Sequence, residues 1–345
     1  MKRLPLSLAG IVLAIGLMPA REVACATGRY KIVARYQPGG EGGWDYLTVD
    51  AASQRLFVTR STRVQVIDLA TGKLLGEIAD TPGVHGVALA PDLGRGFTSN
   101  GRDSTVTVFD LKSLAAVARV HLAARNPDAI LYEPTTRRVF TFNGGSQNAT
   151  AIDAVADTVV GNVFLGGRPE FGVADGKGRV FVNLEDSSAV VGFDARTLAV
   201  GPRWPLAPGE EPTGLAIDRE HRRLFSVCHN QTMIVLDADS GRQVATLPIG
   251  AGTDGAAFDP ATGFAFSSNG SGTVTVVHED AADRFSVVDS VTTQPGARTI
   301  AMDPKTHQLY LATASFGEAP AATPENPRPR RPMVPGSFAI LVLDR

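Results

Sequence analysis

The sequence predicts an all-β fold, a seven-bladed β-propeller, from three observations that support one another. A polar turn followed by an aromatic residue recurs seven times, at spacings between 40 and 44 residues. The segments between these turns are short runs rich in Val, Thr, Ile and Phe, as strands are. No stretch of residues 27–345 shows the periodicity of an amphipathic helix. Regular copies of this length, each filled with short strands, are typical of a propeller.

The recurring aromatic residue places the copies along the chain. Turns such as DAASQRL at 50–56 and DPATGFA at 259–265 come directly before it. The seven aromatic positions are Phe57, Phe97, Phe140, Phe181, Phe225, Phe266 and Tyr310. Because the turn and the aromatic keep the same order in each copy, the copies are expected to have the same strand plan.

Each copy divides into four strands, a to d, joined by turns, so the blades are expected to be four-stranded and antiparallel. In the second copy the four segments are 83–90, 95–100, 104–110 and 115–122. The similar phrases FTSNGRDSTVTVF at 97–109 and FSSNGSGTVTVV at 266–277 then form the b–c corners of blades two and six.

The two ends of the chain predict how the ring closes. The last copy stops at FAILVLDR (338–345), directly after its strand c, and has no strand d. The segment YKIVARYQPGG (30–40) resembles the strands d of other copies. The N-terminal strand is therefore expected to complete the last blade, which leaves no open sheet edge between the first and last blades.

Residues 1–26 have the pattern of a secretory signal peptide. A charged start precedes an apolar run at about 4–17, and Ala24–Cys25–Ala26 supplies an A-x-A cleavage site. Lipidation at Cys25 is the alternative. The remaining residues, 27–345, are expected to form a single domain in a periplasmic or secreted protein.

Composition excludes some functional classes. The net charge is −2, which gives no general reason to expect nucleic acid as a partner. After residue 26 the only cysteine is Cys228, so a disulfide framework is excluded and a buried structural thiol is expected. No segment after residue 26 is long and apolar enough to span a membrane. We expect a monomer.

The repeated phrases resemble those of a known family. The motif [FY]-x-x-N occurs as FTSN, FTFN and FSSN, together with the D-P-x-x-x-x-[LVA]-[FY] turn and the T-V-x-V-x-D strand. With these motifs the chain is similar, over about residues 30–345, to the exported YncE-like propellers built from the YVTN-type repeat. The resemblance implies an exported binding or interaction module. Some similar proteins are linked to DNA, and related propellers include metal-dependent lactonases and a haem-binding domain.

Charged residues are expected to converge where the strands a begin, around the funnel on the propeller axis. The first residues of the strands a are Asp45, His85, Asp128, Glu170, Thr213, Asp254 and Arg298. All except Thr213 are candidate ligand-binding residues. In the alternative interpretation these side chains only accept hydrogen bonds from neighbouring blades and organise the funnel rim.

Convergent carboxylates repel one another unless a cation, protons or an arginine neutralises them. Ca²⁺ suits a site made of Asp45, Asp128, Glu170 and Asp254. Including His85 favours Zn²⁺, Mn²⁺ or Fe²⁺. A divalent metal ion is therefore the candidate cofactor, and its expected ligands are Asp45, His85, Asp128 and Asp254.

Two further groups of polar residues are placed by the repeat. The b–c loops are expected to add side chains to the funnel face, among them Arg60, Asn100, Asn143 and Asn269. On the opposite face, His221 and His307 fall in a–b turns and are expected to be solvated.

An insertion separates strands b and c of the last copy at 315–336. Its proline and arginine content predicts an extended segment, either a disordered loop or a lid over the funnel. Its arginines, Arg328, Arg330 and Arg331, are candidates for binding an acidic partner.

The sequence favours recognition over catalysis. We expect an exported module that binds a small ligand, a metal ion or a protein at the funnel. The alternative is a metal-dependent hydrolase, similar to a lactonase, or a lyase, with Glu170 or Asp128 as the base. Nucleic-acid binding through the arginine-rich insertion is opposed by the acidic funnel.

Overall fold

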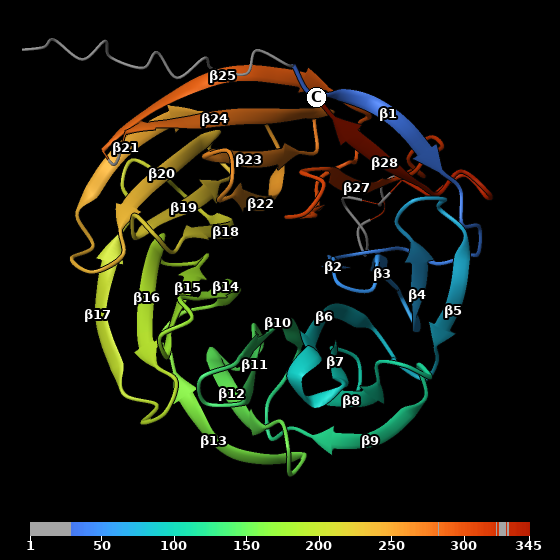
Figure 1. Ribbon diagram of the computed structural model, residues 1–345, viewed down its shortest axis with the longest axis horizontal. Coiled ribbons are helices and arrows are strands. Elements are labelled where there is room, and N and C mark those ends of the chain that lie inside the picture. Colours follow the sequence, from blue (N-terminus) through green and yellow to red (C-terminus); the bar gives the residue numbers. More distant parts are fainter. Residues whose placement is uncertain (1–28, 282, 322, 324–328, 330) are drawn as a thin grey trace, which may run out of the picture.

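The computed structural model describes residues 29–281, 283–321, 323, 329 and 331–345. In this part of the chain, 28 β-strands form seven four-stranded sheets. The sheets stand as blades around a central axis (Figure 1). This arrangement confirms the predicted seven-bladed β-propeller. The predicted signal peptide lies outside the described residues.

Each blade runs from an inner strand beside the axis to an outer strand at the edge of the disc (Figure 1). The strands of the first four blades are β2 (Leu47–Asp50), β3 (Arg55–Arg60), β4 (Arg63–Asp68), β5 (Leu74–Ile78), β6 (Val84–Ala90), β7 (Arg95–Asn100), β8 (Thr105–Asp110), β9 (Ala116–His121), β10 (Pro127–Glu133), β11 (Arg138–Asn143), β12 (Asn148–Asp153), β13 (Thr158–Phe164), β14 (Pro169–Ala174), β15 (Arg179–Leu184), β16 (Ala189–Asp194) and β17 (Val200–Pro205).

The last three blades keep this plan, except that the outer strand of the last blade is the N-terminal strand β1. Their strands are β18 (Pro212–Asp218), β19 (Arg223–Cys228), β20 (Thr232–Asp237), β21 (Gln243–Pro248), β22 (Thr253–Asp259), β23 (Phe264–Asn269), β24 (Thr273–Ala281), β25 (Arg284–Thr292), β26 (Ile300–Met302), β27 (Leu309–Thr313), β28 (Ala339–Asp344) and β1 (Lys31–Tyr36). The described residues also contain one 3₁₀ turn, η1 (Pro91–Leu93). None of their helices is long and apolar enough to cross a membrane.

The recurring aromatic side chains form the centre of each blade. All seven lie on the second strand of their blade and are at most 1% exposed to solvent. Each therefore packs between its own sheet and a neighbouring one, which explains why the position repeats so strictly.

The ring closes as the chain ends predict. Strand β1 pairs antiparallel with β28, so the order in the last blade is β1-β28-β27-β26. The segment after β1 then crosses to the first blade (Figure 1). The N-terminal strand thus joins the two ends of the ring.

Arg60 was predicted to add its side chain to the funnel face, and this prediction was wrong. The side chain binds the crossing segment instead. Its side chain is fully buried at the end of β3. The guanidinium donates hydrogen bonds of 2.9 to 3.3 Å to the carbonyl oxygens of Gly39, Gly40 and Gly42 and to the side chain of Gln65. It also lies 3.6 Å from the ring centroid of Phe338. Burial lowers its pKa to about 10, so Arg60 is charged at neutral pH.

Small residues let the inner strands approach one another at the axis. A β-carbon added at Gly214 would lie 2.6 Å from the backbone nitrogen of Ala256 in the next blade. At Gly86 and Gly255 the added atom would lie 3.0 Å from the side chains of Ile130 and Ile300. The alternation of small and large residues in the strands a therefore reflects contact between blades.

The asparagines of the [FY]-x-x-N phrases are also structural, which corrects their predicted place on the funnel surface. Asn100, Asn143 and Asn269 are fully buried at the ends of their strands b. The Asn100 amide donates to the hydroxyls of Thr105 at 3.0 Å and Thr107 at 2.9 Å on the following strand. Asn269 repeats this pattern with Thr273 and Thr275, and Asn143 donates to the amide oxygen of Asn148 and the hydroxyl of Thr150. The phrase thus fixes the b–c corner.

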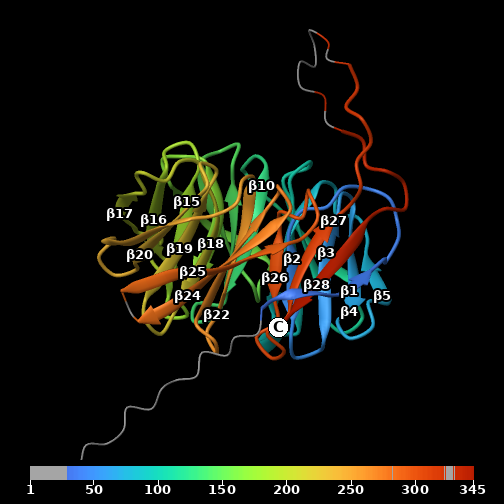
Figure 2. The same cartoon turned by 90° about the horizontal axis from the view of Figure 1, so that it is seen from above.

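The insertion leaves the same face of the ring as the other b–c corners. Its described residues extend away from the ring rather than across its face (Figure 2). A single β-bridge joins Phe316 to Met333 near its base, and Arg331 donates a 2.7 Å hydrogen bond to the carbonyl oxygen of Gly317. Arg328 and Arg330 lie outside the described residues.

Candidate metal centre at the funnel rim

The strands a present charged side chains at the axis because of a local pattern that repeats. Strands β6, β10, β14 and β22 each begin with a buried residue, and the next residue, which belongs to the rim, is only partly buried. Hydroxyls of the preceding blade hold the rim backbone: Ser99 donates to the carbonyl oxygen of Asp128, and Thr299 donates to that of Asp45 at 3.0 Å. The rim is therefore organised before any ligand binds.

Three of the predicted metal ligands come together. The Nδ1 atom of His85 lies 2.7 Å from Oδ2 of Asp45 and 3.5 Å from Oδ1 of Asp128. One donor atom from each residue lies within 4.8 Å of the other two. The side chains are 20% (Asp45), 28% (His85) and 18% (Asp128) exposed, so a small ion can reach them from the funnel. Two carboxylates and one imidazole suit Mn²⁺, Zn²⁺ or Fe²⁺.

Asp254 and Arg298 form a separate pair beside this trio. The Nε atom of Arg298 lies 3.0 Å from Oδ2 of Asp254, and its Nη2 atom lies 3.9 Å from Oδ1 of Asp45. Asp254 thus takes its counter-charge from Arg298 and does not belong to the group formed by Asp45, His85 and Asp128. Thr213 contributes nothing to the funnel mouth, because it is buried and its hydroxyl donates to backbone carbonyls.

Carboxyl groups outnumber basic groups at the rim, and burial together with their mutual repulsion raises several of their pKa values. Burial, reinforced by neighbouring carboxylates, raises the pKa of Glu170 to about 9. Burial also raises the pKa of Asp128 to about 7 and that of Asp254 to about 6, although His85 and Arg298 respectively oppose these shifts. Burial alone would lower the pKa of His85, but Asp45 and Asp128 raise it. A cation would relieve this repulsion.

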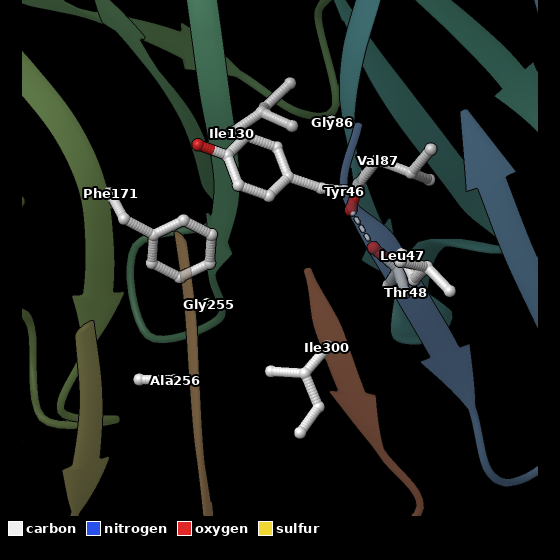
Figure 3. A pocket seen from close by; sticks show the side chains of 10 residues that line it. All are labelled: Tyr46, Leu47, Thr48, Gly86, Val87, Ile130, Phe171, Gly255, Ala256 and Ile300. Atoms are coloured by element: carbon white, nitrogen blue, oxygen red, sulfur yellow. Dashed lines mark hydrogen bonds between the residues drawn. The ribbon is translucent and has the colours of Figure 1, made fainter. Parts of the chain in front are cut away.

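Two aromatic side chains, Tyr46 and Phe171, form the floor of the funnel. Their ring centroids lie 5.2 Å apart, with the rings inclined at 61°. They line a cavity of about 50 Å³ on the axis, shown in Figure 3, together with apolar residues of the inner strands such as Ile130 and Ile300. Burial and the nearby carboxylates raise the pKa of Tyr46 well above its usual value, so the phenol remains neutral.

We did not predict these two aromatics, although the sequence contains a signal for them. Both follow a rim carboxylate directly, as Asp45-Tyr46 and Glu170-Phe171. In the other five blades the residue after the rim position is glycine, alanine or threonine. Two large side chains among five small ones fill the narrow space that seven large side chains would overfill.

A groove beside the trio is large enough for a small organic ligand. Its volume is about 510 Å³, within the usual range for such sites. The residues that line it are Gly43, Trp44, Gly296, Arg298, Phe316 and Arg331. The ring of Trp44 lies 6.1 Å from that of Phe316, and its buried Nε1 atom has no hydrogen-bond partner in the described part of the chain. Two arginines and two aromatic rings favour an anionic ligand with an apolar part.

The thiol of Cys228 and the two histidines of the a–b turns lie outside the rim. Cys228 is fully buried, as predicted, and burial raises its pKa to about 11, which argues against a nucleophile. His221 and His307 are 49% and 34% exposed, in keeping with the prediction that they are solvated, and each also contacts a carboxylate. The Nδ1 atom of His307 lies 2.9 Å from Oδ2 of Asp259, and that of His221 lies 2.7 Å from Oδ2 of Asp218.

Comparisons with known proteins support the fold. No protein-family model matches the chain, and no curated protein matches it. Among solved structures, one described as Kuenenia stuttgartiensis hydrazine synthase matches with a TM-score of 0.70 and 16% identity, over 86% of this chain and 96% of the other. A structure of U3-55K matches with a TM-score of 0.73 and 9% identity, over 90% of this chain and 98% of the other. At these identities the likeness concerns the propeller fold alone.

Proposed function

We propose that this protein is a binding module that holds a divalent cation at the funnel rim and recognises a small anionic ligand beside it. The observation that carries the proposal is the convergence of Asp45, His85 and Asp128, whose donor atoms lie within 4.8 Å of one another. The groove that contains Arg298 and Trp44 adjoins the same rim. An anion placed there contacts the arginines and completes the coordination of the cation.

Recognition fits the site better than hydrolysis does. A general base works best with a pKa near neutral pH, and Asp128 has one, at about 7. However, Asp128 is one of the three proposed ligands, and a bound cation lowers the pKa of a coordinating carboxyl. Glu170, with a pKa of about 9, is already protonated at neutral pH and therefore cannot accept a proton as a general base.

The cation site is tested by measuring metal affinity. We expect His85→Ala and Asp128→Asn each to weaken the binding of Mn²⁺ and Zn²⁺ by at least about 100-fold in calorimetric titrations, because each removes one of three ligands. His229→Ala is the matched control, since this exposed histidine of the same face pairs with Glu211 and is not one of the three proposed ligands. Unchanged affinity in both rim variants would refute the site.

We further propose that the protein belongs to the exported YVTN-type propellers and works in the periplasm or outside the cell. The supporting observations are the repeated [FY]-x-x-N phrases and the signal-like pattern of residues 1–26. Mass spectrometry of the protein recovered from the periplasm of an expressing host is expected to show a chain that starts at Thr27. A lipid-modified Cys25 at the N-terminus, or an intact Met1, would contradict this cleavage.

A further inference from the structure

A second cluster of metal-ligating side chains lies on the face opposite the funnel, between blades five and six. Asp218 ends β18, and His221 follows it in the a–b turn of blade five. Glu279 comes from the neighbouring blade, near the end of β24. One donor atom of each residue lies within 4.8 Å of the other two, as at the rim.

Glu279 reaches this position because blade six departs from the common plan. Its strand c, β24, has nine residues, whereas each of the other six strands c has six. In five blades the last residue of strand c is an aspartate that accepts hydrogen bonds from the following turn, for example Asp110 and Asp237. In blade six His278 takes that position, and the strand continues through Glu279, whose carboxylate lies 3.3 Å from Nδ1 of His221 in blade five.

The three donor atoms are spaced as ligands of one ion. The Nδ1 atom of His221 lies 2.7 Å from Oδ2 of Asp218 and 3.3 Å from Oε1 of Glu279. Ligand atoms at about 2.0–2.2 Å from a tetrahedral ion are separated by about 3.4 Å. The spacing therefore lies close to that of an assembled site.

Burial distinguishes this cluster from an ordinary surface group of acidic residues. The side chain of Glu279 is 4% exposed, and neither of its oxygens has a hydrogen-bond partner in the described part of the chain. Asp218, 2% exposed, accepts hydrogen bonds from the backbone nitrogens of Glu220 and His221. A buried carboxylate without hydrogen bonds is costly, and this one points at a second carboxylate.

We infer that Asp218, His221 and Glu279 form a second divalent-cation site, of the Zn²⁺ or Mn²⁺ class, that ties blade five to blade six. The cation supplies positive charge to the two buried carboxylates and a ligand bond to Glu279, whose oxygens accept no hydrogen bond in the described part of the chain. His221 is 49% exposed, so the ion enters from solvent on its side and keeps water in its remaining coordination positions. This site is independent of the proposed funnel function.

The test uses the full mature chain with the rim trio disabled by Asp45→Asn and Asp128→Asn. We expect this protein to bind one equivalent of Zn²⁺ or Mn²⁺ in a calorimetric titration, and Zn²⁺ to raise its melting temperature. Adding Glu279→Gln, which has nearly the same shape, or His221→Ala should weaken binding at least about 100-fold and abolish the thermal shift. The matched control is His307→Ala, because this histidine also occupies an a–b turn and contacts the carboxylate of Asp259.

Two results of the titrations would overturn the inference. One is the absence of cation binding in the rim-disabled protein, which would leave the cluster as a hydrogen-bonded group held by a proton. The other is unchanged affinity after Glu279→Gln. A second measurement does not depend on how the variants fold: in the wild-type protein, Mn²⁺ should broaden the imidazole proton signals of His221 in NMR spectra and leave those of His307 sharp. Equal broadening of both would contradict the site.

Discussion

Replacing Arg60 by alanine is expected to lower the free energy of unfolding by about 3–5 kcal/mol, the range found when one member of a buried charged network is removed. The guanidinium satisfies the carbonyl oxygens of Gly39, Gly40 and Gly42, and the variant leaves these groups without their donor. It also opens a cavity against Phe338. Urea denaturation monitored by circular dichroism measures the change.

The variant Arg60→Lys distinguishes the effect of the positive charge from the effect of the hydrogen bonds that the planar guanidinium makes. Lysine keeps the positive charge but cannot reach several carbonyls as a planar guanidinium does, so an intermediate loss of about 2 kcal/mol is expected. The control is Arg196→Ala, since Arg196 is exposed on a c–d turn and its loss should cost less than about 0.5 kcal/mol. If Arg60→Ala falls within that same margin, Arg60 does not secure the closure of the ring.

Without bound metal, the protein is expected to lose stability as the pH rises from about 4 to about 9. The folded-state pKa values of Asp254, Asp128 and Glu170, about 6, 7 and 9, all lie above the ordinary values of carboxyl groups. The folded state therefore binds more protons than the unfolded state in this interval. The stabilisation is complete below the ordinary pKa and disappears as the pH passes each folded-state value. The raised pKa of His85 acts in the same direction.

The variant Glu170→Gln removes the contribution of Glu170 to this loss, which continues to a higher pH than the contributions of Asp254 and Asp128. In chelator-treated protein at pH 8 we expect it to raise the free energy of unfolding by about 1 kcal/mol or more, because glutamine does not have to take up the proton that Glu170 binds on folding at this pH. Melting temperatures recorded from pH 5 to 9 measure the effect. The exposed Glu210→Gln is the control and should leave the profile unchanged. A wild-type profile that rises through this interval would contradict the assignment, and saturating Mn²⁺ should flatten it.

The sequence predicts the fold well because the pattern of one blade occurs seven times along the chain. A single turn before Phe97 would be weak information, but seven turns at one spacing average out local irregularity. The rim residues follow for the same reason: each occupies one position of the repeat, and a circular arrangement brings equal positions together. Ring closure can also be predicted by counting strands. The last copy has no strand d, and one extra strand precedes the first copy.

What could not be predicted depends on contacts that break the repeat. Arg60 has the position of a funnel residue, but the crossing segment exists only where the ring closes, and it draws the side chain inward. Asp254 has the position of a metal ligand, but Arg298 of the next blade takes its carboxylate. Glu279 meets Asp218 only because β24 is longer than its counterparts. Each of these contacts exists because two neighbouring blades differ from the common pattern. A comparison of the seven copies shows what they share and does not show such differences.

The pairing of β1 with β28 makes closure of the ring depend on residues 339–344. The first strand to be synthesised finds its partner only after residues 339–344 have been made, because Lys31 lies opposite Asp344. A chain that stops earlier keeps an unpaired strand at each end of its sheet array, and such edges invite proteases, chaperones and aggregation. Closure of the ring thus depends on one strand pairing, which joins residues near opposite ends of the sequence.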